Sequence, residues 1–162
     1  MSNQRRWRGE RGEWYVILQF FLFALIAFGP ESTEWLPSWE GRIRTVSQLF
    51  GLLFAGCGLL LLAAGTLHLG SNLTALPHPK DDAKLVTHGA YRFVRHPIYS
   101  GILLGALGWS LWKGSPLMLI YSGILLLFFD IKSRKEEQWL TNKFDQYEQY
   151  QSKVPKLLPF VY

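Results

Sequence analysis

The chain is poor in cysteine and in charge. Cys57 is its one cysteine among 162 residues, which excludes an internal disulfide framework and a cysteine-rich metal site. The four histidines are too scattered along the sequence for a zinc site, so we expect no metal. Charged residues make up 18% of the chain, against 49% hydrophobic and 15% aromatic residues. Such a composition is unusually apolar for a soluble protein of this length.

The excess of basic residues, a formal net charge of +5, does not indicate nucleic acid. Lysines and arginines flank apolar stretches and form no single patch interleaved with aromatic residues. Basic residues in that position favour a membrane surface as the partner, and we expect no nucleic-acid binding.

Four uncharged stretches predict the architecture: residues 14–30, 45–67, 97–112 and 114–129. A helix that crosses the hydrocarbon core needs about 20 apolar residues. The second stretch exceeds this length and the first just reaches it. We interpret the two shorter ones as a hairpin of two spans around Lys113 and Pro116, with a re-entrant hairpin as the alternative. The sequence thus predicts an all-α, polytopic integral membrane protein with about four transmembrane helices, forming a single domain over residues 1–162.

The flanking charges predict the orientation. No small-residue cleavage pattern follows the first stretch, which we therefore interpret as a retained span and not a signal peptide. Arginine and lysine concentrate before this stretch, between the second and third, and after the fourth. The positive-inside rule then places both termini and the second loop in the cytoplasm, and the loop around Glu34 outside. If the protein is bacterial, its membrane is the plasma (inner) membrane.

Small residues in the apolar stretches predict close helix packing. Gly101, Gly105 and Gly108 form a groove along the third stretch, and in lipid such grooves let helix backbones approach closely. Cys57 lies in the second stretch and is expected to be an inert core residue.

The segment Arg95-His96-Pro97 predicts a binding site at a helix start. Proline suits the first turn of a helix, so Arg95 and His96 lie at the amino-terminal mouth of the third stretch. Free backbone N–H groups and the positive end of the helix dipole favour an anion there. The planar guanidinium of Arg95 suits a carboxylate or a phosphate.

The tail after the fourth stretch supplies acidic groups. If the helix continues, Arg134 and Glu137 are i,i+3 neighbours and Lys132 and Glu136 are i,i+4 neighbours. One interpretation is an exposed ion-paired face, which contributes little. The other is a glutamate pair that faces the mouth of the third stretch and binds a zwitterion or a cation with its own carboxylate.

The segment LVTHGAYRFVRHPIYSG at residues 85–101, with the downstream Glu136-Glu137 pair and the Tyr-x-x-Tyr…Pro tail, resembles the isoprenylcysteine carboxyl methyltransferase family. That family is related to the membrane phospholipid methyltransferases. The resemblance covers residues 69–159. It implies S-adenosyl-L-methionine as methyl donor, a helical membrane fold, a cofactor pocket at the cytoplasmic face and a lipidic acceptor that enters from the bilayer.

The resemblance also implies residue roles. Catalytic roles fall to Arg95, Arg134 and Glu137, the arginines holding the carboxylate of methionine or that of the acceptor. Cofactor-binding roles fall to Leu85, Val86, Gly89, Tyr91, His96, Pro97, Tyr99, Glu136 and Glu137. Of these, His96 and Tyr99 hold the polar end of the cofactor, and Glu136 or Glu137 contacts its ribose hydroxyls or amino group. The tail Phe144-Asp145-Gln146-Tyr147 is one residue shorter than the family pattern.

The expected function is S-adenosylmethionine-dependent methyl transfer to a lipidic or isoprenoid acceptor, with carboxyl O-methylation favoured over N-methylation. The donor is already activated, so the enzyme must align the reacting groups and exclude water. One alternative is an NADPH-dependent membrane reductase resembling sterol reductases, although Ile98 stands where those proteins typically have asparagine. Another is a four-span membrane protein without catalytic activity.

Overall fold

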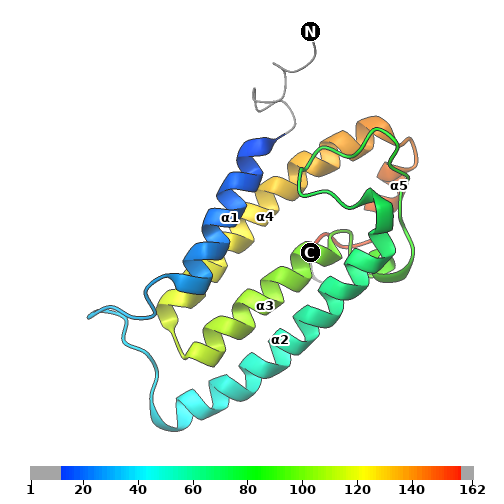
Figure 1. Ribbon diagram of the computed structural model, residues 1–162. Helices are drawn as coiled ribbons and strands as arrows, with labels where there is room; N and C mark the ends of the chain where they lie inside the picture. Colours follow the sequence, from blue (N-terminus) through cyan, green and yellow to red (C-terminus); the bar gives the residue numbers. More distant parts are fainter. Residues whose placement is uncertain (1–11, 158–162) are drawn as a thin grey trace.

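The computed structural model describes residues 12–157, and these residues are entirely helical or irregular. The helices are α1 (Glu13–Phe28), α2 (Gly41–Leu69), α3 (Pro97–Lys113), α4 (Pro116–Lys143) and the short α5 (Tyr147–Gln151). Two 3-10 turns, η2 (Gly70–Asn72) and η3 (Gly89–Arg92), lie between α2 and α3. The four long helices run side by side, and α5 gathers with the α2–α3 connection at one end of the bundle (Figure 1).

Each of the four apolar stretches forms a helix. The fourth continues past residue 129 to Lys143, so the acidic tail is helical. In the described range, α2 with η2 (Gly41–Asn72) and α4 (Pro116–Lys143) are long and apolar enough to cross a membrane. α1 is shorter, and spans by α1 and α3 stay predictions, as does the orientation. The basic residues at positions 5, 6, 8 and 11 lie outside the described residues.

The outward faces of the helices are apolar. Only 17% of the apolar window of α2 is buried inside the protein. Large exposed apolar surfaces are rare on soluble monomers and are ordinary where lipid covers them. Cys57 belongs to this outer face and is exposed, so its expected place in the core is wrong.

Glycines bring α2 and α3 into backbone contact. A Cβ added to Gly58 would lie 2.7 Å from the Gly101 carbonyl oxygen, and one added to Gly108 would lie 2.6 Å from the Ala55 nitrogen. Since residues nearer the start of α2 meet residues nearer the end of α3, the two helices are antiparallel. The expected groove is therefore present, with one correction. A Cβ on Gly105 would meet nothing within 4 Å among the described atoms, although the Gly105 nitrogen would lie 2.7 Å from a Cβ on Gly58.

The α3–α4 turn is built from short-range hydrogen bonds. Gly114 ends α3 in the left-handed region at φ +63°, which glycine adopts without strain. Ser115 caps α4 by accepting the Met118 N–H at 3.0 Å. Beside the turn, Lys113 forms an ion pair with Glu31 over 2.6 Å. The two helices then run antiparallel, joined by a Ser110–Ser122 hydroxyl contact of 2.9 Å.

The start of α3 anchors the carboxyl-terminal tail. Pro97 is the first residue of α3, as its sequence position predicts. The backbone N–H groups of Arg95 and His96 donate to the carbonyls of Pro155 and Lys156 over 2.9 and 3.1 Å. The tail therefore returns to the helix mouth and closes one side of the site described next.

Candidate functional site

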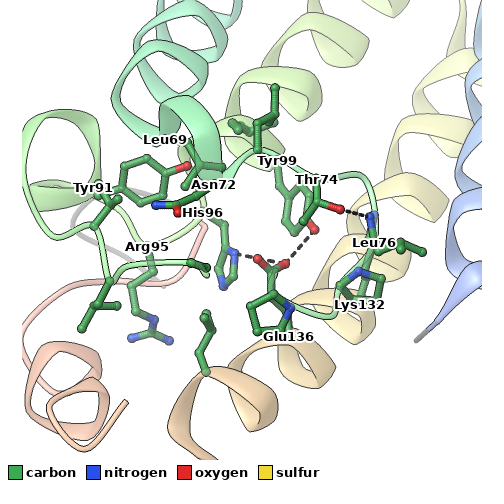
Figure 2. Close-up of a pocket in the computed structure, with 18 of the residues that line it drawn as sticks. Leu69, Asn72, Thr74, Leu76, Tyr91, Arg95, His96, Tyr99, Lys132 and Glu136 are labelled. Atoms are coloured by element: carbon green, nitrogen blue, oxygen red, sulfur yellow. Dashed lines mark hydrogen bonds and ion pairs between the residues drawn. The ribbon is translucent and has the colours of Figure 1, made fainter. Parts of the chain in front are cut away.

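A cavity of about 430 Å³ lies at the end of the bundle where α5 and the α2–α3 connection gather. It is within the size range of small-molecule sites. Its polar side chains come from the α2–α3 connection and from α1, α3, α4 and α5, and most of its apolar side chains come from the α2–α3 connection and α3. Figure 2 shows the labelled part of this lining. The lining includes Gln19, Asn72, Leu76, Leu85, Val86, Tyr91, Arg95, His96, Ile98, Tyr99, Lys132, Glu136, Tyr147 and Tyr150.

Glu136 is the carboxylate that faces the cavity. Its Oε2 accepts a hydrogen bond from the Tyr99 hydroxyl at 2.7 Å and lies 3.9 Å from His96 Nδ1. The Tyr99 ring is stacked between His96, at a centroid distance of 5.4 Å, and Phe129, at 4.5 Å. Stacking fixes the ring on both faces, so the hydroxyl holds the carboxylate in one position (Figure 2).

Glu137, the next residue, turns to the tail. Its Oε1 accepts from Arg95 Nε at 2.7 Å and lies 3.0 Å from His96 Nε2, while Oε2 accepts from Gln151 at 3.1 Å. Arg95 also donates through Nη1 to the carbonyls of Gln151 and Val154. Arg95 and Glu137 therefore form an ion pair with each other. They are direct partners, and together they fasten the tail to the mouth of α3.

Lys132, which the sequence offered only as a helix neighbour of Glu136, is a buried residue of the cavity wall. It is 1% exposed, although it belongs to a run of tail charges. Its ammonium donates to Gln19 Oε1 at 2.5 Å and to the Ala75 carbonyl at 3.0 Å, and it lies 5.2 Å from the Tyr99 ring centroid. The expected pairing of Lys132 with Glu136 is thus replaced by contacts to α1 and to the α2–α3 connection. Its spacing of four residues from Glu136 is the one sequence signal that places it on the same helix face.

The α2–α3 connection covers the cavity and is pinned at its base. The Asn72 side chain donates to the Lys84 carbonyl at 3.0 Å and accepts the Lys84 N–H at 3.1 Å. This double hydrogen bond brings Leu85 and Val86 to the cavity wall. Gly89 follows at φ +62°, and a Cβ there would lie 2.1 Å from the His68 ring, so this glycine is required for packing.

The structure brings together most of the predicted cofactor residues. The ones that line the cavity are Leu85, Val86, Tyr91, His96, Tyr99 and Glu136, along with Arg95. Gly89, Pro97 and Glu137 are not part of the lining, although Glu137 is bonded to Arg95 and His96, which are. Arg134 is 64% exposed and donates from Nε to Asp130 at 2.9 Å, on the far side of Glu137.

The tyrosines outside the long helices are neutral hydrogen-bonding groups. Burial, and then the charge of Glu136, raises the pKa of Tyr91. Burial also raises the pKa of Tyr150, whose hydroxyl donates to the Tyr91 carbonyl at 2.6 Å. Both hydroxyls therefore stay protonated at physiological pH.

The arrangement suits a ligand with both polar and apolar parts. Arg95 and Tyr91 lie at one end, the buried ammonium of Lys132 lies beside Leu76 at the other, and the Glu136 carboxylate, the His96 imidazole and the Tyr99 hydroxyl lie between them (Figure 2). Among the described residues, no group of three or more histidine, cysteine or acidic side chains is placed to hold a metal ion. Fold and site together define a class of protein: a bundle of membrane-type apolar helices with a small-molecule site at one end.

The chain belongs to the phospholipid methyltransferase family, whose family model matches residues 46–147. A relative is the protein-S-isoprenylcysteine O-methyltransferase of Schizosaccharomyces pombe, 35% identical over 123 residues, which are 74% of this chain and 52% of the relative. Another is the cobalt-zinc-cadmium resistance protein of Cupriavidus metallidurans, 28% identical over 152 residues, 91% of this chain and 62% of that protein.

A solved structure also resembles the fold. It is a eukaryotic intramembrane Ras methyltransferase, an isoprenylcysteine carboxyl methyltransferase, with a TM-score of 0.64 and 26% identity. The match covers 92% of this chain and 52% of that one. The chain thus spans about half the length of the first relatives it matches.

Proposed function

We propose that the protein transfers a methyl group from S-adenosyl-L-methionine to the carboxylate of a lipidic or isoprenoid acceptor. The observation that carries this proposal is the division of one cavity between a Glu136–Tyr99–His96 cluster and the buried ammonium of Lys132. The Glu136–Tyr99–His96 cluster is suited to the methyl donor, which is cationic and rich in hydroxyl groups. The Lys132 ammonium is suited to an anionic methyl acceptor. Kinship with named O-methyltransferases supports the same activity.

The residues present fit the methyl donor. Glu136 is an acceptor for ribose hydroxyls or for the donor's amino group, and Tyr99 holds it in place at 2.7 Å. Leu85 and Val86 give an apolar wall for the adenine ring. When bound, S-adenosylmethionine supplies an activated methyl group on a sulfonium. The chain's contribution is to orient this group and to exclude water, for which the covered cavity is suited.

Lys132 is the proposed anchor of the acceptor. Its ammonium lies between Gln19 of the apolar helix α1 and the α2–α3 connection, on the side of Glu136 away from Arg95 (Figure 2). A carboxylate is ionised at neutral pH and needs no general base, so a cation that positions it suffices. A buried ammonium disfavours an amine acceptor, which can itself carry positive charge. This residue is the reason to favour O-methylation over N-methylation.

Arg95 and Glu137 take a positioning role in this proposal. Their 2.7 Å ion pair holds the tail against α3, and His96 joins the pair from the cavity side. Arg134 has no direct part, because it lies on the exposed surface behind Glu137. In this proposal the acceptor enters from the bilayer and the cavity opens near the cytoplasmic face. Both termini are cytoplasmic. A bacterial protein of this kind belongs in the inner membrane.

The test is an assay of membranes that contain the protein with methyl-labelled S-adenosylmethionine. We expect label in the lipid extract. Mild base should release this label, because it hydrolyses methyl esters. Base-stable label would indicate a methylamine and contradict O-methylation. Thermal unfolding of the detergent-solubilised protein gives an independent arm: S-adenosylhomocysteine raises the melting temperature, whereas stabilisation by NADPH alone favours a reductase.

A further inference from the structure

Tyr147 is the first residue of α5 and lines the cavity. Its side chain is 1% exposed, which makes it one of the most buried large side chains of the described chain. The Tyr147 N–H donates to the Phe144 carbonyl at 2.9 Å. The ring packs edge-on against Tyr150 at a centroid distance of 5.8 Å. Tyr150 is itself hydrogen-bonded to the Tyr91 carbonyl at 2.6 Å, so the ring against which Tyr147 packs is fixed.

The hydroxyl of Tyr147 has no hydrogen-bond partner. Within residues 12–157 it is the one buried side-chain nitrogen or oxygen atom in this condition. The neighbouring tyrosine hydroxyls are bonded, that of Tyr99 to Glu136 and that of Tyr150 to a carbonyl. A buried, unbonded hydroxyl opposes folding, since it has given up its water without replacement. Phenylalanine would pack equally well here, so folding alone does not account for the hydroxyl.

The surroundings of this hydroxyl define what it can do. Burial, and then the charge of Glu137, raises the pKa of Tyr147, so the group is a neutral donor at physiological pH. The charges that act on it are those of Glu137, Arg95 and Glu136. The charge of Lys132 is not among them, and Arg95 lies at the end of the cavity away from Lys132, with Glu136 between the two (Figure 2). The hydroxyl is thus near the donor end of the proposed site and away from the acceptor end.

We infer that the Tyr147 hydroxyl donates a hydrogen bond to an oxygen or ring nitrogen of the methyl donor, and that it has no direct contact with the lipidic acceptor. This inference rests on the proposed function. The ligand atom is an acceptor because the Tyr147 hydroxyl is a protonated donor, whereas Glu136 and Glu137 accept hydrogen bonds and serve donor groups. Tyr147 then donates a hydrogen bond where Glu136 accepts one. This difference distinguishes one orientation of bound S-adenosylmethionine from the reverse.

The test compares Tyr147→Phe with Tyr150→Phe in the full chain. Titration with S-adenosylhomocysteine follows the affinity, and thermal unfolding without ligand follows stability. We expect Tyr147→Phe to unfold at or slightly above the wild-type temperature and to bind S-adenosylhomocysteine about three- to tenfold more weakly, the loss of one neutral hydrogen bond. Tyr150→Phe loses a bond within the protein, so it should unfold at a lower temperature than the wild type.

Three results would overturn the inference. Unchanged S-adenosylhomocysteine affinity in Tyr147→Phe means that the hydroxyl does not touch the donor. An unchanged affinity with a raised KM for the lipid means that it serves the acceptor. A melting temperature lowered as much as in Tyr150→Phe means that it has a structural partner. Wild-type protein that does not bind S-adenosylhomocysteine contradicts the proposed function itself, which separates the two failures.

Discussion

Replacing Lys132 by methionine tests where the acceptor binds. The substitution keeps an unbranched side chain in a site that is 1% exposed, and it removes two hydrogen bonds, to Gln19 and to the Ala75 carbonyl. Leaving the Gln19 amide oxygen without its donor costs about 1–3 kcal/mol. Removing a buried ammonium relieves a desolvation penalty of several kcal/mol, which offsets the loss of its hydrogen bonds. We therefore expect little change in the melting temperature.

Turnover should respond much more strongly than stability. A hydrogen bond between an ammonium and a carboxylate contributes about 1.5–3 kcal/mol. At 1.4 kcal/mol for each factor of ten, its loss lowers kcat/KM for the lipid acceptor by about 10- to 150-fold. Lys132→Arg, which keeps the charge, should retain more activity than the methionine variant.

The assay measures methyl transfer to extracted lipid acceptor in detergent or nanodiscs, with S-adenosylhomocysteine titration in parallel. Lys135→Met is the matched control, because Lys135 lies on the exposed side of the same helix. The reasoning is refuted if Lys132→Met keeps wild-type kcat/KM for the acceptor. It is equally refuted if the loss lies in S-adenosylhomocysteine affinity, since Lys132 would then serve the donor.

Other consequences of the structure can be measured separately. Gly108→Ala should destabilise the protein by about 1–3 kcal/mol through overpacking against α2. Gly105→Ala is the control and should change stability by less than about 1 kcal/mol, so equal melting temperatures for the two variants would contradict the glycine interface. Arg95→Lys loses the planar fork that reaches the tail carbonyls, and we expect it to lower the melting temperature by the equivalent of about 1–3 kcal/mol, whereas a purely ligand-binding arginine would leave the ligand-free protein unchanged. Reporters inserted near Glu34 and near Asp81 should report opposite sides of the membrane; the same side for both would contradict the four-span topology.

The helices could be predicted from the sequence because their signals are local. Uncharged stretches of sufficient length can satisfy backbone groups in lipid only as helices. Proline at residue 97 and glycine at residue 114 mark a helix start and a helix end by their own conformational restrictions. The Arg95-His96-Pro97 segment and the two glutamates were also found in sequence, and all of them lie in or directly behind one cavity.

Only the tertiary structure decided which side chain faces which way. Adjacent residues of a helix point about 100° apart, so Glu136 and Glu137 cannot both face the cavity. Their assignment depends on the rotation of α4 about its axis. The first half of α4 is apolar all round and the second half carries charges at consecutive positions, so neither half has a periodic signal for that rotation. The rotation is set by packing against α1 and α3. The burial of Lys132 under Gln19, over a separation of 113 residues, and the unbonded hydroxyl of Tyr147 follow from the same long-range packing.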